Sequence, residues 1–114
     1  AIVDAAMNDL MRPSLYDAYH EIINIISHNL DKKEYDIVGP VCETGDFFGK
    51  NRLLSIKNKD LLAILDTGAY GMSMSSNYNT RPRSVEILVD NEKSHIIRER
   101  ETFEHLISGE SILP

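Results

Sequence analysis

Cysteine is nearly absent from this sequence, and its few histidines show no spacing typical of metal ligands. Cys42 is the single cysteine among 114 residues, so an internal disulfide and a cysteine-rich zinc site are both excluded. A lone thiol in a chain without disulfides fits the reducing cytoplasm. The sequence therefore predicts a cytoplasmic protein without a metal site.

Long apolar runs and excess positive charge are also missing. The apolar run over 61–65 is far shorter than the roughly 20 residues that a membrane-spanning helix needs. Acidic residues outnumber basic ones by 18 to 12, and the net charge of −6 disfavours binding to nucleic acid or to an anionic membrane. There is no glycine-rich phosphate loop, nucleophile elbow or Rossmann fingerprint. The sequence thus gives no sign of the enzyme classes that depend on those motifs.

What remains is the composition of an ordinary globular domain. Hydrophobic residues make up 42% and charged residues 26% of the chain, as in folded soluble proteins. The length fits one domain over residues 1–114. The chain opens with Ala1 directly before the apolar Ile2 and Val3, and we expect it to come from within a longer protein.

Apolar periodicity predicts a mainly β domain with short helices. We expect about six strands, over residues 1–4, 20–26, 35–42, 60–66, 84–90 and 95–98, and a loop over 45–51. The strand over 60–66 should be buried on both faces because its apolar run is continuous. A helical turn is expected over 13–18, and a final helix should begin after Thr102 and stop at Gly109.

Cys42 and Glu43 form the first pair with chemical potential. A thiol can exchange a proton near neutral pH, and a carboxylate can hold an ammonium group. Neighbouring side chains in a strand point to opposite faces, so both residues serve one site only if the strand ends there. The alternative is a structural cysteine beside a solvated glutamate.

Arg12, Tyr16 and Tyr70 are the other candidates. Arg12 and Tyr16 lie four residues apart, on one face of the expected helical turn, where an arginine fork and a hydroxyl suit a carboxylate. Tyr70 stands between Gly68 and Gly71, and small residues let a backbone approach a ligand closely. The alternatives are an arginine stacked on a packing tyrosine, and a tight bend around a packed Tyr70.

In this order, these segments resemble the C-terminal part of the diaminopimelate decarboxylase family. The similar runs are MNDLMRPSLYDAYH (7–20), VGPVCETGD (38–46), TGAYGMSMSSNYN (67–79) and RPR (81–83), with 86–89 and 97–100 continuing the similarity. The resemblance covers nearly the whole chain. It implies a C-terminal β-barrel or Greek-key-like β-sandwich. In that family this domain packs beside an N-terminal (β/α)8 barrel, whose lysine carries pyridoxal 5'-phosphate.

The resemblance also implies an activity. The family converts meso-2,6-diaminopimelate to L-lysine and CO2 in lysine biosynthesis, as a homodimer with the active site at the subunit interface. No lysine of this chain lies in a matching motif. We therefore expect the barrel to be absent from these 114 residues and the piece to be inactive by itself.

By the same resemblance, each candidate residue takes a role. Arg12 and Tyr16 would bind a substrate carboxylate, and Glu43 would hold the distal ammonium group. Cys42 would be the general acid that returns a proton after CO2 leaves. Cys42 and Glu43 would act in the site of the partner subunit, whereas Tyr70 would contact cofactor and substrate in its own.

Two alternatives stay open at the level of the sequence. A related pyridoxal-phosphate decarboxylase could act on ornithine or arginine, but ornithine lacks a second carboxylate and leaves Arg12 and Tyr16 less to bind. A non-catalytic, β-rich interaction module would keep the fold without the chemistry. The joint presence of Cys42, Glu43 and Tyr70 with the Arg12 pair disfavours that module.

Overall fold

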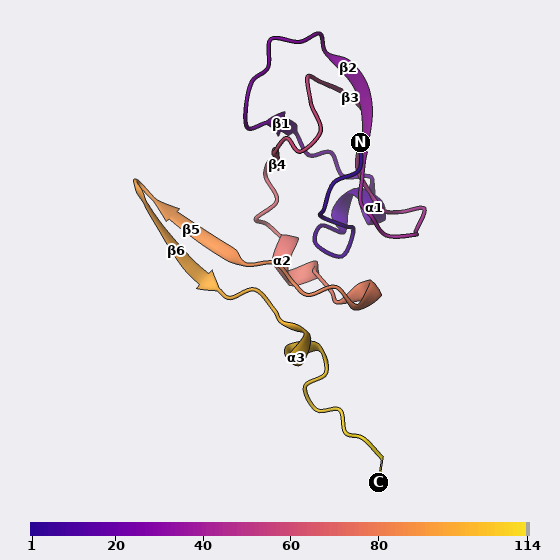
Figure 1. Ribbon diagram of the computed structural model, residues 1–114, viewed down its shortest axis with the longest axis vertical. Coiled ribbons are helices and arrows are strands. Elements are labelled where there is room, and N and C mark those ends of the chain that lie inside the picture. The colour runs from indigo at the N-terminus through magenta and orange to yellow at the C-terminus, as the bar shows by residue number, and fades with distance from the viewer. Residues whose placement is uncertain (114) are drawn as a thin grey trace. The chain divides into compact units, whose positions relative to one another are not determined.

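Short strands joined by long loops make up most of the chain (Figure 1). The computed structural model describes residues 1–113. Its elements are α1 (Arg12–Tyr16), β1 (Ile22–Asn24), β2 (Lys33–Val38), β3 (Phe47–Leu54), β4 (Leu62–Ile64), α2 (Gly71–Met74), the 3-10 turn η1 (Tyr78–Thr80), β5 (Glu86–Asp90), β6 (Lys93–Arg98) and α3 (Phe103–Leu106). The expectation of a mainly β protein with short helices is confirmed.

The strands pair antiparallel in twos, and no closed barrel forms among residues 1–113. The pairs are β1 with β4, β2 with β3, and β5 with β6. Two compact units result, one over Ala1–Ser75 and one beginning at Ser76. Each unit is described by itself below.

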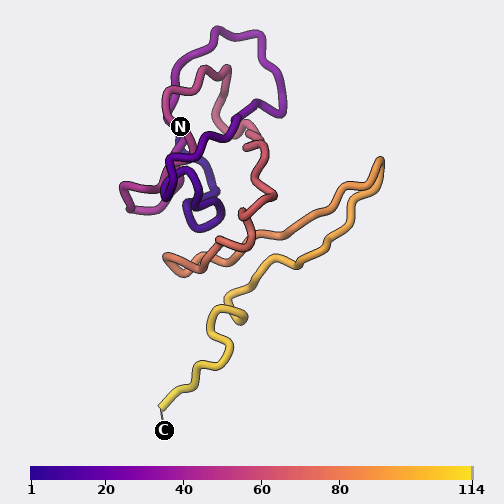
Figure 2. Tube along the Cα trace, turned by 180° about the vertical axis from the view of Figure 1, so that it is seen from behind, coloured from indigo at the N-terminus to yellow at the C-terminus, as the bar shows by residue number. Residues whose placement is uncertain are grey.

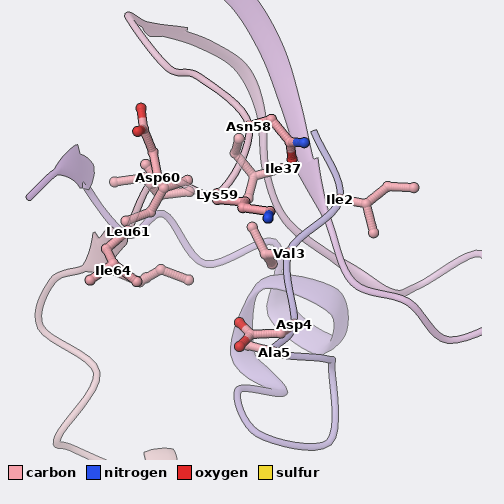
Figure 3. Close-up of a pocket in the computed structure, with 12 residues that line it drawn as sticks. Ile2, Val3, Asp4, Ala5, Ile37, Asn58, Lys59, Asp60, Leu61 and Ile64 are labelled. Atoms are coloured by element: carbon pink, nitrogen blue, oxygen red, sulfur yellow. The ribbon is translucent and has the colours of Figure 1, made fainter. Parts of the chain in front are cut away.

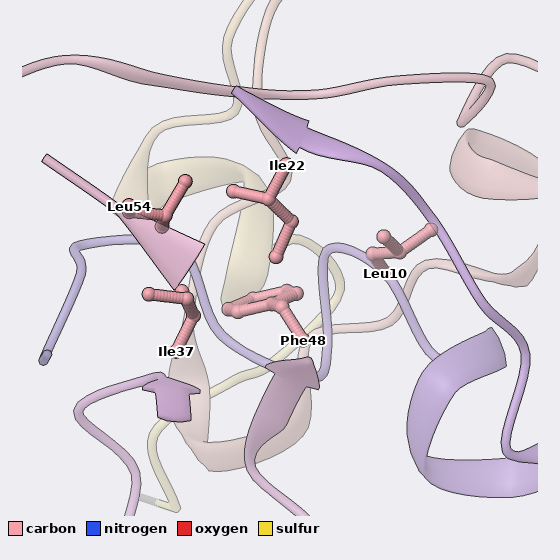
Figure 4. Packing of buried hydrophobic residues seen from close by; sticks show 5 residues of the cluster. All are labelled: Leu10, Ile22, Ile37, Phe48 and Leu54. Atoms are coloured by element: carbon pink, nitrogen blue, oxygen red, sulfur yellow. The ribbon is translucent and has the colours of Figure 1, made fainter. Parts of the chain in front are cut away.

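The core of the first unit gathers around Phe48, which is 1% exposed. Figure 4 shows its ring among Leu10, Ile22, Ile37 and Leu54. Ile37 comes from β2 and Leu54 from β3, whereas Leu10 and Ile22 come from the segments on either side of α1. The apolar core thus holds the α1 region against the β2–β3 pair.

The single turn of α1 has clear start and stop signals. Pro13 lies in its first turn and is buried, where a fixed φ and a missing N–H do no harm. Asp17 ends the helix in the left-handed conformation (φ 53°), and its N–H donates to the carbonyl of Arg12. Arg12 and Tyr16 therefore stand at the two ends of one helical turn, as the sequence predicts.

The second unit is a hairpin followed by a short helix. β5 and β6 run side by side (Figure 2), and Asp90 pairs with Lys93 across a two-residue turn. Asn91 in that turn has a φ of 55°, which asparagine tolerates well. The predicted hairpin is confirmed. Thr102 precedes α3, and its N–H donates to Nδ1 of His105 at 3.0 Å.

Several predictions about individual elements are wrong. The loop predicted over 45–51 contains the start of β3, which pairs with β2; this pairing outweighs the weak local strand preference of glycine and asparagine. The segment over 60–66 is not buried on both faces, because Leu61 is 66% exposed and β4 is only half-buried. The strand predicted over 1–4 is a single parallel bridge between Ile2 and Val38.

Candidate functional site

Arg12 lies against two tyrosines that are far apart in the sequence. Its guanidinium carbon is 5.5 Å from the ring centroid of Tyr16 and 5.3 Å from that of Tyr70. Both distances fall within the range of a cation–π interaction. Tyr16 and Tyr70 are each 61% exposed, so the cluster of one cation and two rings is open to a ligand.

The backbone at Tyr70 has an unusual conformation. Tyr70 precedes α2 with a φ of 66°, a left-handed value that is rare for a bulky residue. Its carbonyl accepts a hydrogen bond from the N–H of Met74 at 3.0 Å, which fixes the turn. A Cβ at Gly68 or at Gly71 would meet no atom within 4 Å apart from those of the adjoining backbone and chain neighbours. Gly68 is exposed, whereas Gly71 is buried, so the chain leaves this tyrosine open on the side of Gly68.

Cys42 and Glu43 lie on a tight loop rather than on a strand. β2 ends at Val38, so the prediction that the strand reaches Cys42 is wrong. The Glu43 N–H donates to the Val41 carbonyl at 2.8 Å, and both Cys42 and Glu43 are exposed. Because the strand has already ended, its alternation of faces does not separate these two side chains.

Asp46 closes this loop, although nothing in the sequence marks it out beyond its place in the run over 38–46. It is 4% exposed. Its Oδ1 accepts from the Met7 N–H and its Oδ2 from the Val41 N–H, both at 2.7 Å. Its carbonyl accepts from the N–H of Gly39 at 3.0 Å. Burial and partners so distant in sequence are visible only in the folded chain.

The structure thus arranges the five predicted residues in two groups within one unit. Arg12, Tyr16 and Tyr70 form one cluster, and Cys42 with Glu43 forms the other. The loop that carries the second group packs on α1. Gly45 lies so close to Ser14 that a Cβ at Gly45 would overlap the Ser14 hydroxyl.

An apolar hollow of this unit lies in a different place. It has a volume of about 370 Å³ and is lined by side chains that include Val3, Ile37 and Ile64 (Figure 3). At its rim, Asp60 accepts from the Lys57 N–H at 2.7 Å and contacts His28 at 2.7 Å. The Lys57 hydrogen bond, and then His28, hold the pKa of Asp60 below its usual value. None of the predicted site residues lines this hollow.

Neither a metal cluster nor a membrane helix is found in the part of the chain that the structure describes. No group of three or more His, Cys, Asp or Glu residues over 1–113 is arranged to hold a metal ion. Over the same residues, no helix is both long and apolar enough to cross a membrane.

Comparison with known proteins gives one consistent family. The family model for the C-terminal sheet domain of pyridoxal-dependent decarboxylases matches residues 1–68. The chain is 54% identical over 114 residues to a diaminopimelate decarboxylase of Pseudomonas aeruginosa, covering all of this chain and 28% of that protein. The chain therefore spans little more than a quarter of the length of such relatives.

Solved structures agree with this result. A diaminopimelate decarboxylase from M. jannaschii matches with a TM-score of 0.93 and 46% identity, over 99% of this chain and 26% of that one. A second structure from M. jannaschii, in complex with L-lysine, matches with a TM-score of 0.91, 46% identity and the same coverage. At 46% identity the likeness is one of sequence as well as of fold.

Proposed function

The chain belongs to the pyridoxal-dependent decarboxylase family, as its C-terminal sheet domain, and from this membership we propose that it is the substrate-binding and proton-donating part of a diaminopimelate decarboxylase. The observation that carries the proposal is the cluster in which Arg12 lies over both Tyr16 and Tyr70. It places a carboxylate-binding cation beside two exposed hydroxyl-bearing rings.

The proposed reaction converts meso-2,6-diaminopimelate to L-lysine. The bond between an α-carbon and its carboxylate breaks, CO2 leaves, and a proton takes its place at that carbon. Relatives that are 54% identical over the whole chain carry the name diaminopimelate decarboxylase. A solved relative was crystallised with L-lysine, which would be the product here.

The residues present fit pyridoxal 5'-phosphate as the cofactor. When bound, this group withdraws the electron pair that departing CO2 leaves behind. Tyr70 and the neighbouring Gly68 are both exposed, so a phosphate-bearing ring has room to approach the Tyr70 hydroxyl, which can donate a hydrogen bond to it. The remainder of the enzyme would supply the lysine and most of the other cofactor contacts.

Arg12, Tyr16 and Glu43 would hold the end of the substrate that does not react. The guanidinium of Arg12 offers two parallel N–H donors to the distal carboxylate, and the Tyr16 hydroxyl adds a third. The exposed carboxylate of Glu43 would pair with the distal ammonium group. Ornithine has no distal carboxylate, so it would leave the Arg12 fork without a partner.

Cys42 would deliver the proton to the carbon that has lost CO2. Its thiol is free and exposed, as a general acid that must meet a substrate has to be. We infer a homodimer in which Cys42 and Glu43 reach the site of the partner subunit. In that cytoplasmic enzyme, both units of this chain would form one β-domain of the barrel or sandwich type.

A substrate comparison on the full-length protein tests this proposal. The protein that contains this chain, loaded with pyridoxal 5'-phosphate, is assayed with meso-diaminopimelate, ornithine and arginine, and both CO2 and the amine product are measured. We expect L-lysine from diaminopimelate and a far lower kcat/KM for the other two. A preference for ornithine or arginine, or no turnover of any of the three, would overturn the proposal.

A further inference from the structure

We propose that Asp46 is a positioning residue of the decarboxylase. Its buried carboxylate holds the segment that leads into α1 and the loop that carries Cys42 and Glu43 in one fixed arrangement. This inference rests on the proposed function for its catalytic consequence, although the contacts themselves do not.

The geometry at Asp46 is that of a staple between two segments. Oδ1 accepts from the Met7 N–H and Oδ2 from the Val41 N–H, each at 2.7 Å. Such short bonds from backbone N–H groups to a carboxylate are among the stronger hydrogen bonds in proteins. With 4% exposure, the carboxylate depends on these donors in place of water.

Gly39 shows how closely the carboxylate is held. A Cβ at this position would overlap both carboxylate oxygens of Asp46. Meanwhile the Gly39 N–H donates to the Asp46 carbonyl and the Asp46 N–H to the Glu43 carbonyl, both at 3.0 Å. The loop therefore packs closely around Asp46, and any side chain at Gly39 would displace the Asp46 carboxylate.

The two stapled amides lie close in sequence to the groups of the proposed site. Val41 directly precedes Cys42, and Met7 lies five residues before Arg12. A shift at either amide would move the proton donor or the carboxylate clamp, and a misplacement of about 1 Å can cost roughly 100-fold in rate. Cys42 would serve the partner's site, whereas Arg12 lies against Tyr70 and would serve the same site as that tyrosine, in its own subunit. Asp46 would therefore fix both sites at once.

A role in stability alone is the competing explanation, and it makes a different prediction. A residue that only stabilises the fold changes the amount of folded enzyme but not the turnover of each folded site. The decisive quantity is therefore kcat per mole of bound cofactor, measured well below the unfolding temperature.

The test compares Asp46→Asn with Asp36→Asn in the full-length holoenzyme. Asparagine keeps the size of the side chain but turns an NH2 group toward one of the two amides. We expect kcat per bound cofactor to fall by roughly 10- to 100-fold in Asp46→Asn. Asp36 is the control, because its carboxylate accepts one backbone N–H, from Asn51 at 2.9 Å, and lies outside the loop that carries Cys42. Asp36→Asn should keep the wild-type kcat.

Hydrogen exchange gives a readout that does not depend on activity. The amides of Met7 and Val41 should exchange faster in Asp46→Asn than in the wild type, and at the wild-type rate in Asp36→Asn. If the wild-type enzyme does not decarboxylate diaminopimelate, the proposed function fails, and unchanged exchange at these two amides is then what would refute the staple.

Gly39→Ala covers the case in which Asp46→Asn fails to fold. It keeps the carboxylate but pushes it from its place, and it should lower kcat per bound cofactor in the same direction while exposing the same two amides to exchange. Wild-type turnover per cofactor in either folded variant, together with faster exchange, would reduce Asp46 to a purely structural residue and overturn the inference.

Discussion

Arg12 connects two parts of the first unit that are distant in the sequence. It begins α1, yet its guanidinium reaches Tyr70 in a distant part of the same unit. The four-residue spacing to Tyr16 predicted their proximity, because side chains at i and i+4 share a helix face. The approach of Tyr70 was not predictable from spacing, since it depends on the path of the chain through two β pairs.

Replacing Arg12 by lysine tests the carboxylate clamp. Arg12→Lys keeps the positive charge but loses the planar fork, so the KM for diaminopimelate in the full-length enzyme should rise by about 10-fold. Steady-state kinetics measures it. Arg52 is a matched control, because it also lies over a tyrosine, Tyr19, at 4.0 Å. An equal rise in KM for Arg52→Lys would argue against a specific role for Arg12.

Among the elements, β3 supplies two core residues, Phe48 and Leu54, that the sequence patterns did not place in a strand. Glycine, lysine and asparagine at 49–51 read locally as a loop, whereas in the structure Gly49 is buried within the strand. The pairing with β2 is also irregular, with register shifts on either side of Ile37. Alternation rules assume a regular ladder, so they could not place this strand, although they did place β5 and β6.

Phe48→Ala should show how much β3 contributes to stability. Removing this ring leaves a cavity between Leu10, Ile22 and Ile37, and the free energy of unfolding should fall by about 3–5 kcal/mol. Urea denaturation measures the change. Leu53 on the same strand is 64% exposed, and Leu53→Ala should change stability by no more than about 0.5 kcal/mol. Similar losses in both variants would show that the core is not centred on Phe48.

The segments on either side of the hairpin in the second unit are joined by one carboxylate. Glu101 accepts from the Arg83 N–H at 2.8 Å, from the Asn77 amide at 2.6 Å and from the Arg83 guanidinium at 3.0 Å. Led by the Arg83 backbone bond, these contacts lower the pKa of Glu101 from 4.5 to about 2. The stability of the second unit should therefore decrease at acidic pH.

The pH dependence follows from the sign of that pKa shift. The folded state holds the charged carboxylate more strongly than the unfolded state, so the stabilisation is complete above pH 4.5 and is lost as the pH falls toward about 2. Glu101→Gln should lower stability at neutral pH, and its difference from the wild type should shrink across that window. Thermal unfolding at a series of pH values checks it. A difference that stays constant with pH would contradict the assignment.

At the scale of the whole molecule, the chain carries site residues but not a whole site. The family resemblance seen in the sequence is confirmed by a match over the full chain, yet the chain spans only 28% of that relative. The barrel or sandwich predicted from the family does not close within residues 1–113. The proposed activity therefore depends on how two full-length subunits combine these residues.

Hybrid dimers show whether two subunits share each active site. Full-length subunits with Cys42→Ala and with Arg12→Ala are co-expressed with different affinity tags, and the mixed dimer is isolated. One of its two sites would then combine an intact Arg12 with an intact Cys42 from the other subunit. We expect about half of the wild-type rate of lysine formation for this hybrid, with both variant homodimers strongly impaired. A hybrid no more active than the mean of the two homodimers would contradict it.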